Sequence, residues 1–365
     1  MTGSAGSKAG TGGATAGAGG SGGVGGSGGA GGAGDGGPNP GAARPPVPPG
    51  PGNVPPPSGS TANLKVVPWA GFRGAVTYTF DDSQPSQIDH FADIQAAGVP
   101  VTYYITTVNN WYAGYDATWK EAFARGNELG NHTVNHCYAN LTCPSGMALP
   151  TLAAEIDQAT DYITTRLGSP DVYTMAYPFG DADYRAAAQA RFFLGRIAGP
   201  GSTNGMVAPS DATDPFLLPV IAAAGGEAAS KFNGDIDAAR TQGKWVTFLF
   251  HSLLPDAQNW FAGVDIATVT GSIAHAKALS DMWIDTFANV GAYWLGQKTL
   301  QAATSTSAAG STTWTWSLPS HFPPGKILRV TVDGGTLKQN MTTLVWDGHG
   351  YYEILLDTGT LTWSP

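Results

Sequence analysis

The chain has 365 residues and a formal net charge of −9, with only 12% charged residues but 11 Trp and 13 Tyr. This acidic, lysine-poor composition argues against nucleic-acid binding, because that function needs a basic footprint. No apolar run approaches the roughly 18 residues of a membrane-spanning helix, so we expect no transmembrane segment. The many aromatic side chains suit neutral, ring-shaped ligands such as sugars.

Residues 1–62 differ in composition from the rest of the chain. Residues 1–60 hold 23 of the 51 Gly and 10 of the 26 Pro, and the first aromatic residue is Trp69. Such a segment cannot bury enough apolar surface to offset the entropy of ordering, so we predict disorder, with a stiffer polyproline II stretch at RPPVPPGPGNVPPP. We expect a tether that ends in a lipid or cell-wall anchor. A cloning or low-complexity artefact is the alternative.

The start of the chain and its two cysteines both bear on export. No signal peptide is recognisable after Met1, since a charged start and an apolar core are missing. Because of the tether, we expect an extracellular or cell-envelope protein whose targeting segment has been removed. Cys137 and Cys143 lie six positions apart, and a local disulfide would fit export. Two free thiols, or extra metal ligands, are the alternatives.

Strand and helix patterns alternate after residue 74. Runs rich in β-branched and aromatic residues predict strands at 74–80, 100–105 and 245–252, and a strand that runs into a loop at 172–180. Apolar spacing and terminal Asp, Thr or Gly residues predict helices at 116–126, 151–168, 183–191 and 272–291. The alternation predicts an α/β domain over residues 63–300, built from βα units around a parallel sheet or barrel.

The predicted secondary structure changes after about residue 300. Residues 302–312, AATSTSAAGST, read as a small-residue linker. Short strand patterns follow, separated by turns such as DGG and DGH, and helix patterns vanish. We predict a small, sandwich-like all-β module over residues 310–365.

Three groups of residues could carry chemistry. Asp81 and Asp82 follow the strand at 74–80, at the end where α/β sites collect catalytic groups. His132 and His136 are spaced so that both imidazoles could reach one ion, and neutral imidazole binds zinc-class metals well. His251 closes the apolar strand at 245–252. Taken singly, each group also fits a structural role: a turn or cap Asp pair, surface histidines, or a satisfied core histidine.

The order of the motifs is more specific than any one of them. TFDD at 79–82, HTVNH at 132–136, YPFG at 177–180 and FLFH at 248–251 together resemble the polysaccharide deacetylases of the NodB-homology type, the fourth carbohydrate-esterase family, over roughly residues 72–296. The resemblance implies a distorted (β/α) barrel with fewer than eight regular strands. It also implies removal of acetyl groups from N-acetylglucosamine polymers, such as chitin or the peptidoglycan glycan, or from O-acetylated xylan.

The resemblance also assigns roles to individual residues. It implies that Asp81 is the general base and His251 the general acid. It implies one divalent metal ion, which we expect to be zinc, bound by a carboxylate and two imidazoles: Asp82, His132 and His136. Three residues of the third motif would form the substrate pocket: Tyr177, Pro178 and Phe179. Thr133, inside the second motif, is expected to make a local hydrogen bond.

The chain departs from the family pattern in two places. The third motif usually reads R-x-P-Y, and here Ala176 stands where the arginine would orient the catalytic Asp. Three other arginines could supply that charge: Arg73, Arg185 and Arg196. The motif D-x-x-D-W has only a partial counterpart in DATDP at 211–215, where Asp214 could orient His251.

We therefore expect a monomeric, metal-dependent hydrolase that deacetylates an acetylated glycan. An O-acetyl xylan esterase would use the same residues on an ester. The competing prediction is a catalytically silent carbohydrate-binding protein on the same scaffold, because the arginine of the third motif is missing.

Overall fold

The computed structural model describes residues 44–108, 115–258 and 261–365. Residues 1–43, which make up most of the predicted tether, lie outside the described residues. Within the described ranges, no helix is both long and apolar enough to cross a membrane.

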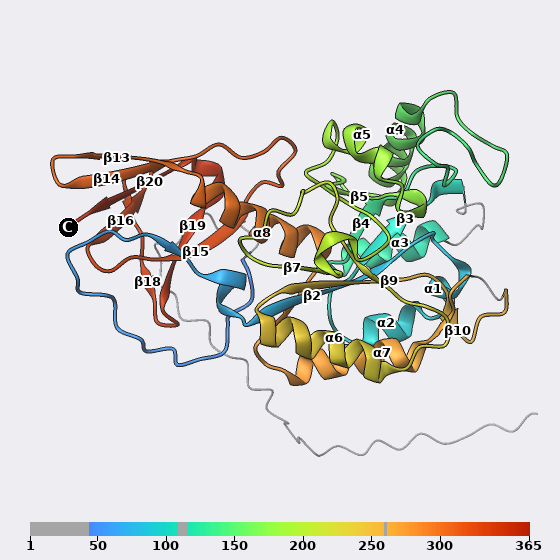
Figure 1. Cartoon of the computed structure of the whole chain (residues 1–365), viewed down its shortest axis with the longest axis horizontal. Helices are drawn as coiled ribbons and strands as arrows, with labels where there is room; N and C mark the ends of the chain where they lie inside the picture. The colour runs from blue at the N-terminus through green and yellow to red at the C-terminus, as the bar shows by residue number, and fades with distance from the viewer. Residues whose placement is uncertain (1–43, 109–114, 259–260) are drawn as a thin grey trace, which may run out of the picture. The chain divides into compact units, whose positions relative to one another are not determined.

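A curled, mainly parallel sheet forms the centre of the α/β domain (Figure 1). Along one path its strands are ordered β6-β5-β4-β3-β2-β9. They are β2 (Gly74–Phe80), β3 (Thr102–Ile105), β4 (Glu128–Asn131), β5 (Thr174–Ala176), β6 (Leu194–Arg196) and β9 (Trp245–Phe250). Every residue of β2 and β9 is buried, as expected for strands covered on both faces.

A short stretch of chain closes the gap between the two ends of this path. Leu218 forms a parallel bridge to Arg196 of β6. A few residues later, β8 (Ile221–Ala222) pairs in parallel with β9. The segment between them thus joins β6 to β9 with little regular strand, which confirms the predicted distorted (β/α) barrel. Two further short strands extend the sheet: β7 (Met206–Val207) runs antiparallel to β9, and β12 (Met282–Ile284) runs parallel to β2.

Helices surround the sheet, and most predicted helices are present. They are α1 (Pro85–Asp89), α2 (Phe91–Ala96), α3 (Tyr115–Ala124), α4 (Leu152–Tyr162), α5 (Arg185–Gln189), α6 (Ala229–Gln242), α7 (Ile266–Ala278) and α8 (Phe287–Gln301). The helix predicted at 151–168 is α4 with the helical turn that continues it to Leu167. Its first turn is capped by the hydroxyl of Thr151, which accepts from the Ala154 amide.

The single helix predicted at 272–291 is wrong. The structure splits this stretch into the end of α7, the strand β12 and the start of α8. The interruption has a tertiary cause: Met282–Ile284 pair with the first half of β2, which buries Met282 and Trp283. Pairing with the sheet therefore outweighs local helix propensity here.

The last part of the chain folds as two antiparallel sheets, as predicted for an all-β module. One sheet is ordered β1-β15-β19-β18 and the other β13-β14-β20-β16-β17. The strands are β1 (Lys65–Val66), β13 (Thr304–Ala308), β14 (Ser311–Thr315), β15 (Ile327–Thr331), β16 (Thr336–Gln339), β17 (Thr342–Thr343), β18 (Trp346–Asp347), β19 (Tyr351–Leu355) and β20 (Thr360–Ser364). The expected linker at 302–312 is instead largely the β13–β14 hairpin.

The β-module and the barrel share a hydrophobic core. Trp294 and Leu295 of α8 belong to the same buried cluster as Leu328 of β15 and Leu356 after β19. β1, which precedes the barrel in sequence, adds an edge strand to the module through Lys65 and Val66. We therefore treat residues 302–365 as a module packed onto the barrel through α8, not as a separate body.

Candidate metal centre

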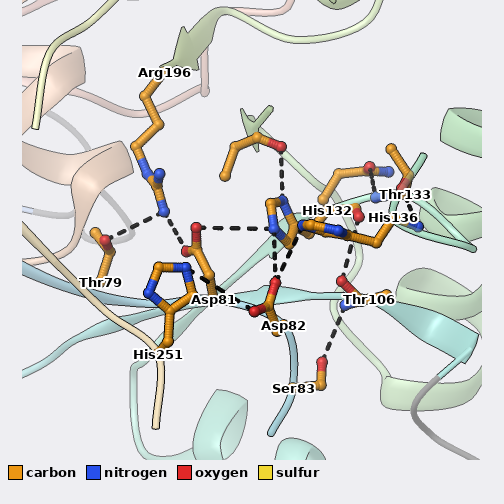
Figure 2. A network of polar contacts seen from close by, with 12 residues as sticks. Thr79, Asp81, Asp82, Ser83, Thr106, His132, Thr133, His136, Arg196 and His251 are labelled. Atoms are coloured by element: carbon orange, nitrogen blue, oxygen red, sulfur yellow. Dashed lines mark hydrogen bonds and ion pairs between the residues drawn. The ribbon is translucent and has the colours of Figure 1, made fainter. Parts of the chain in front are cut away.

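Three side chains converge where β2 and β4 end (Figure 2). The carboxylate oxygen Asp82 Oδ1 lies 3.2 Å from His132 Nε2 and 3.3 Å from His136 Nε2. One ligand atom from each residue falls within 4.8 Å of the other two. In a tetrahedral zinc site with bonds of about 2.0 Å, neighbouring ligand atoms lie about 3.3 Å apart. The donor set and its spacing therefore fit a single divalent cation.

The backbone around these ligands is strained. Asp82 (φ 74°), Thr133 (φ 66°) and His136 (φ 52°) all adopt left-handed conformations that non-glycine residues rarely take. Thr133 makes the local hydrogen bond expected of it, since its hydroxyl accepts from the His136 amide at 3.1 Å. Such strain persists only where the surrounding structure imposes it, and it is typical of functional sites.

A hydrogen bond fixes the tautomer of His132. Its Nδ1 lies 2.9 Å from the carbonyl oxygen of Ala176, which can only accept, so Nδ1 must carry the proton. The lone pair of Nε2 then faces the Asp82 carboxylate. Two acceptors that face each other need a proton or a cation between them. A carbonyl behind an imidazole is the usual arrangement of a metal-ligating histidine.

The charges of the three groups are strongly coupled. Burial opposes ionisation of Asp82, but its hydrogen bond with His132 and the nearby histidines hold its pKa well below the usual range. Burial also works against a charged His132, yet Asp81 and Asp82 outweigh it and raise the pKa of that imidazole. Burial and then His132 lower the pKa of His136 to about 4. At neutral pH, His136 is therefore an uncharged imidazole beside an ionised carboxylate.

The second carboxylate, Asp81, is buried in an ion pair with an arginine. Its Oδ1 accepts from Nη2 of Arg196, and its Oδ2 lies 3.8 Å from His132 Nε2. Arg196 is fully buried, stacks over the ring of Tyr104 at 4.4 Å and also approaches the hydroxyl of Thr79 (Figure 2). Of the three candidate arginines, Arg196 therefore contacts Asp81.

The strand register explains how Arg196 reaches this position. Ala176, where the family motif has its arginine, is the direct partner of Arg196 in the parallel pairing of β5 with β6. The other two candidates are engaged elsewhere: Arg73 pairs with Asp281 and Arg185 with Asp214. The guanidinium thus comes from the neighbouring strand at the same level of the sheet.

His251 reaches the site from the end of β9. Its Nε2 lies 4.0 Å from Asp82 Oδ2, and Figure 2 shows the ring approaching Asp82 from the side opposite to His136. Its buried Nδ1 has no hydrogen-bond partner within the described part of the chain. Asp214, a candidate to orient His251, is engaged instead by Arg185 Nε at 2.6 Å. The orienting role suggested for Asp214 is therefore wrong.

The third motif forms one wall of a cavity of about 1180 Å³ that also contains the metal candidates. Tyr177 lines it while donating its hydroxyl to the Phe216 carbonyl at 2.6 Å, and Phe179 lines it at the rim. Pro178 is buried at the start of the 3₁₀ turn Pro178–Gly180 and shapes that turn. Small residues from Ala222 to Gly225 line another part of the wall.

Exposed aromatic rings stand at the mouth of this cavity. Phe179 stacks on Tyr138 with ring centres 4.1 Å apart, and it meets His136 edge-on. Phe261, which is 73% exposed, meets His251 edge-on. Tyr138 and Phe261 were not identified from the sequence, because nothing in their local pattern marks them as neighbours of the motifs.

The loop that carries His136 is held from behind. The predicted disulfide between Cys137 and Cys143 is present. The buried carboxylate of Glu155, on α4, accepts from the Asn135 amide, the Asn135 side chain and the Leu149 amide. Glu155 is a second residue that the sequence did not identify, since in sequence it is only one polar position of an amphipathic helix.

Residues 72–193 match the family model described as "Polysaccharide deacetylase". No curated protein matches the chain. Solved structures with a similar fold include a putative polysaccharide deacetylase from Mycobacterium smegmatis (15% identity, 65% of this chain and 96% of that chain, TM-score 0.45).

Two further solved structures are similar at lower TM-scores. One is the Xyl-CE4 domain of a multidomain xylanase from the hindgut metagenome of Trinervitermes trinervoides (14% identity, 60% and 89% coverage, TM-score 0.40). The other is a CE4 esterase from Streptococcus mutans (18% identity, 59% and 86% coverage, TM-score 0.38). The family match, which spans the TFDD, HTVNH and YPFG motifs, confirms the resemblance on which the site residues were assigned. The similarity to the polysaccharide deacetylase family is thus shown over residues 72–193.

Proposed function

We propose that the protein removes acetyl groups hydrolytically from an N-acetylglucosamine polymer, such as chitin or the glycan of peptidoglycan. The observation that carries this proposal is the convergence of Asp82, His132 and His136 beside the buried Asp81–Arg196 pair, in a cavity wide enough for a sugar. A metal triad with a carboxylate outside it suits hydrolysis better than simple structural metal binding, because structural sites are closed by four protein ligands.

The ion would be held by Asp82, His132 and His136, and we propose that it is zinc, which this mixture of imidazole and carboxylate suits. When bound, such a cation makes a water molecule more acidic and polarises an acyl carbonyl. The protein prepares the site for it through the Ala176 carbonyl, which keeps the His132 lone pair free.

Asp81 is the proposed general base. Its carboxylate lies beside the triad, and Arg196 fixes its orientation while stacked on Tyr104. Held in this way, Asp81 can take the proton of the water that attacks the acetyl carbonyl. A carboxylate anchored by a buried guanidinium loses little entropy when it acts, which is the advantage of a preorganised base.

His251 is the proposed general acid. It faces the same cavity from β9 and would give its proton to the nitrogen or oxygen of the leaving sugar. The products are then acetate and the glycan with a free amine or hydroxyl in place of the acetyl group. Tyr177 and Phe179 would enclose the acetyl group, and the exposed rings of Tyr138, Phe179 and Phe261 would stack on sugar rings at the mouth.

Two alternatives follow from the same residues. O-acetyl xylan esterase activity stays a prediction, because a base, an acid and a metal serve an ester as well as an amide. A catalytically silent glycan-binding protein is less favoured. The reason for considering it was the missing arginine of the third motif, and Arg196 supplies that positive charge beside Asp81. We further propose an extracellular or cell-envelope location, which the Cys137–Cys143 disulfide supports.

The test is an acetate-release assay in the presence of zinc or cobalt. Acetate would be measured from chito-oligosaccharides, peptidoglycan and acetylated xylan, each with the wild type and with Asp81→Asn. We expect release from an N-acetylated glycan and none from the variant. Glycan binding without acetate release by the wild type would support the silent protein instead, and release from xylan alone would support the esterase.

A further inference from the structure

The described end of the predicted tether lies on the β-module. We call residues 44–62 the arm; it contains eight prolines and neither helix nor strand. Although sequence composition predicted disorder up to residue 62, the arm makes specific bonds to turns and strands of the module. We propose that the β-module is a clasp for an extended, proline-rich strand, and that the arm of the same chain is its ligand.

Arg329, in the middle of β15, makes the first of these contacts. Its side chain is 1% exposed, lies over the ring of Tyr351 at 4.3 Å and forms an ion pair with Glu353. Its remaining donors reach the carbonyls of Pro46 (Nη1, 2.8 Å) and Pro45 (Nη2, 2.9 Å) and of Ala70 (Nη1, 2.8 Å).

These bonds account for all five N–H groups of the guanidinium. Nε donates to Glu353, Nη1 to Pro46 and Ala70, and Nη2 to Pro45 and Glu353. Without the arm, two donors of a fully buried cation would lose their partners, which is unfavourable. Arg44 of the arm also pairs with Glu353, so this carboxylate joins the module to the arm through two arginines.

Hydrogen bonds to the main chain of the arm hold it at two further points. Trp346 donates its indole N–H to the Val54 carbonyl at 2.8 Å, and the Val54 amide donates to the Gly348 carbonyl at 2.8 Å. Further along, the Gly59 amide donates to the carbonyl of Asp333 at 2.8 Å. Prolines lack an N–H and are pre-set for an extended helix, so recognition through their free carbonyls by aromatic and basic side chains suits them.

Two turn glycines of the module leave room for the arm. A Cβ added at Gly334 would lie 1.8 Å from the carbonyl oxygen of Gly59, and one at Gly348 would lie 2.2 Å from that of Gly52. The nearest atoms to both are arm backbone, and neither glycine has a positive φ that would itself require glycine. Close approach of the arm is therefore the structural reason for glycine at these turns.

The role that follows for the module differs from glycan binding. By holding residues 44–62, the clasp fixes the arm to the folded body. Through Ala70, Arg329 also ties the arm to the left-handed turn at Trp69 and Ala70, just before β2. We expect the clasp to stay closed whether or not the metal centre is active.

Hydrogen–deuterium exchange on the full-length protein tests the clasp. In the wild type, the Val54 and Gly59 amides should exchange slowly. Gly348→Ala should lower protection at Val54, and Gly334→Ala at Gly59, each by at least about tenfold, while β19 amides stay protected. Gly234→Ala on α6, where an added Cβ meets nothing within 4 Å, is the matched control and should leave the arm unchanged.

Trp346→Phe gives a second test of the clasp that leaves the turn glycines unchanged. It removes the indole donor to Val54 but keeps an aromatic ring next to Tyr352. Trp316→Phe is its control, because that indole donates to Leu356 inside the module. Only Trp346→Phe should speed exchange at Val54. Arm amides that exchange at the rate of an unstructured peptide in the wild type, or that respond to none of Gly334→Ala, Gly348→Ala and Trp346→Phe, would overturn the proposal.

Discussion

The buried ion pair between Asp81 and Arg196 can be broken from either side. Arg196 is fully buried, bonded to Asp81 and stacked over Tyr104. Arg196→Met keeps much of the volume but leaves a carboxylate that is 2% exposed without its cation. Breaking such a pair costs about 3–5 kcal/mol, and the lost cation–π contact adds about 0.5–2 kcal/mol. We expect the free energy of unfolding to fall by at least about 3 kcal/mol.

A double-mutant cycle isolates the pair from the packing around it. Asp81→Asn combined with Arg196→Met removes both charges, so no uncompensated charge stays buried. The double variant should therefore be more stable than the sum of the single losses predicts, by about 2–3 kcal/mol. Arg191→Met is the control, because Arg191 pairs with Asp157 at the surface and should cost only about 0.2–1 kcal/mol.

Urea unfolding followed by circular dichroism gives the four free energies of the cycle. Additive losses, within about 0.5 kcal/mol, would refute a coupled pair. Acetate release adds a second readout. Because Ala176 and Arg196 are register partners, Ala176→Arg with Arg196→Ala should recover part of the activity that Arg196→Ala loses. No recovery in a folded double variant would contradict the idea that the two positions are equivalent.

Three other predictions concern separate features. Cys137→Ser with Cys143→Ser should lower the free energy of unfolding by about 2 kcal/mol, since the disulfide closes a short loop; equal urea midpoints would contradict this. Burial raises the pKa of Glu128, so the folded state holds its proton more tightly, and stability should fall as pH rises from the unfolded pKa near 4.5 to the raised folded value. Glu128→Gln should flatten that slope in urea titrations across this range. Phe179→Ala should raise KM for a chito-oligosaccharide about 3–10-fold with kcat little changed, if the ring stacks on sugar; a loss confined to kcat would argue against stacking.

The metal candidates could be predicted from the sequence because their chemistry is local. Asp82 follows the end of a strand with a clear β pattern by two residues, and His132 and His136 form a recognisable motif four residues apart. The role of Arg196 could not be chosen in the same way. Only the register of β5 against β6 places it beside Asp81, and a sequence does not state which residues of two strands face each other.

The arm and strand β12 could not be predicted from the sequence, because their structure depends on distant parts of the chain. Residues 44–62 have neither a helical nor a strand pattern, and their partners, such as Arg329, are more than 250 residues away. Composition therefore predicted a tether that extends to residue 62, and we propose instead that it ends before Arg44. Met282–Ile284 continue a helical pattern locally, and they form a strand because the pairing with β3 involves only the second half of β2 and leaves Gly74–Val76 available to them.

Metal content measured together with acetate release tests the central claim most directly. The purified wild type, Asp82→Ala, His132→Ala and Asp81→Asn would be loaded with zinc, desalted and examined by elemental analysis. The account predicts about one zinc ion per chain in the wild type and in Asp81→Asn, little in the two ligand variants, and acetate release by the wild type alone. Full zinc in folded Asp82→Ala and His132→Ala, or undiminished release by Asp81→Asn, would contradict it.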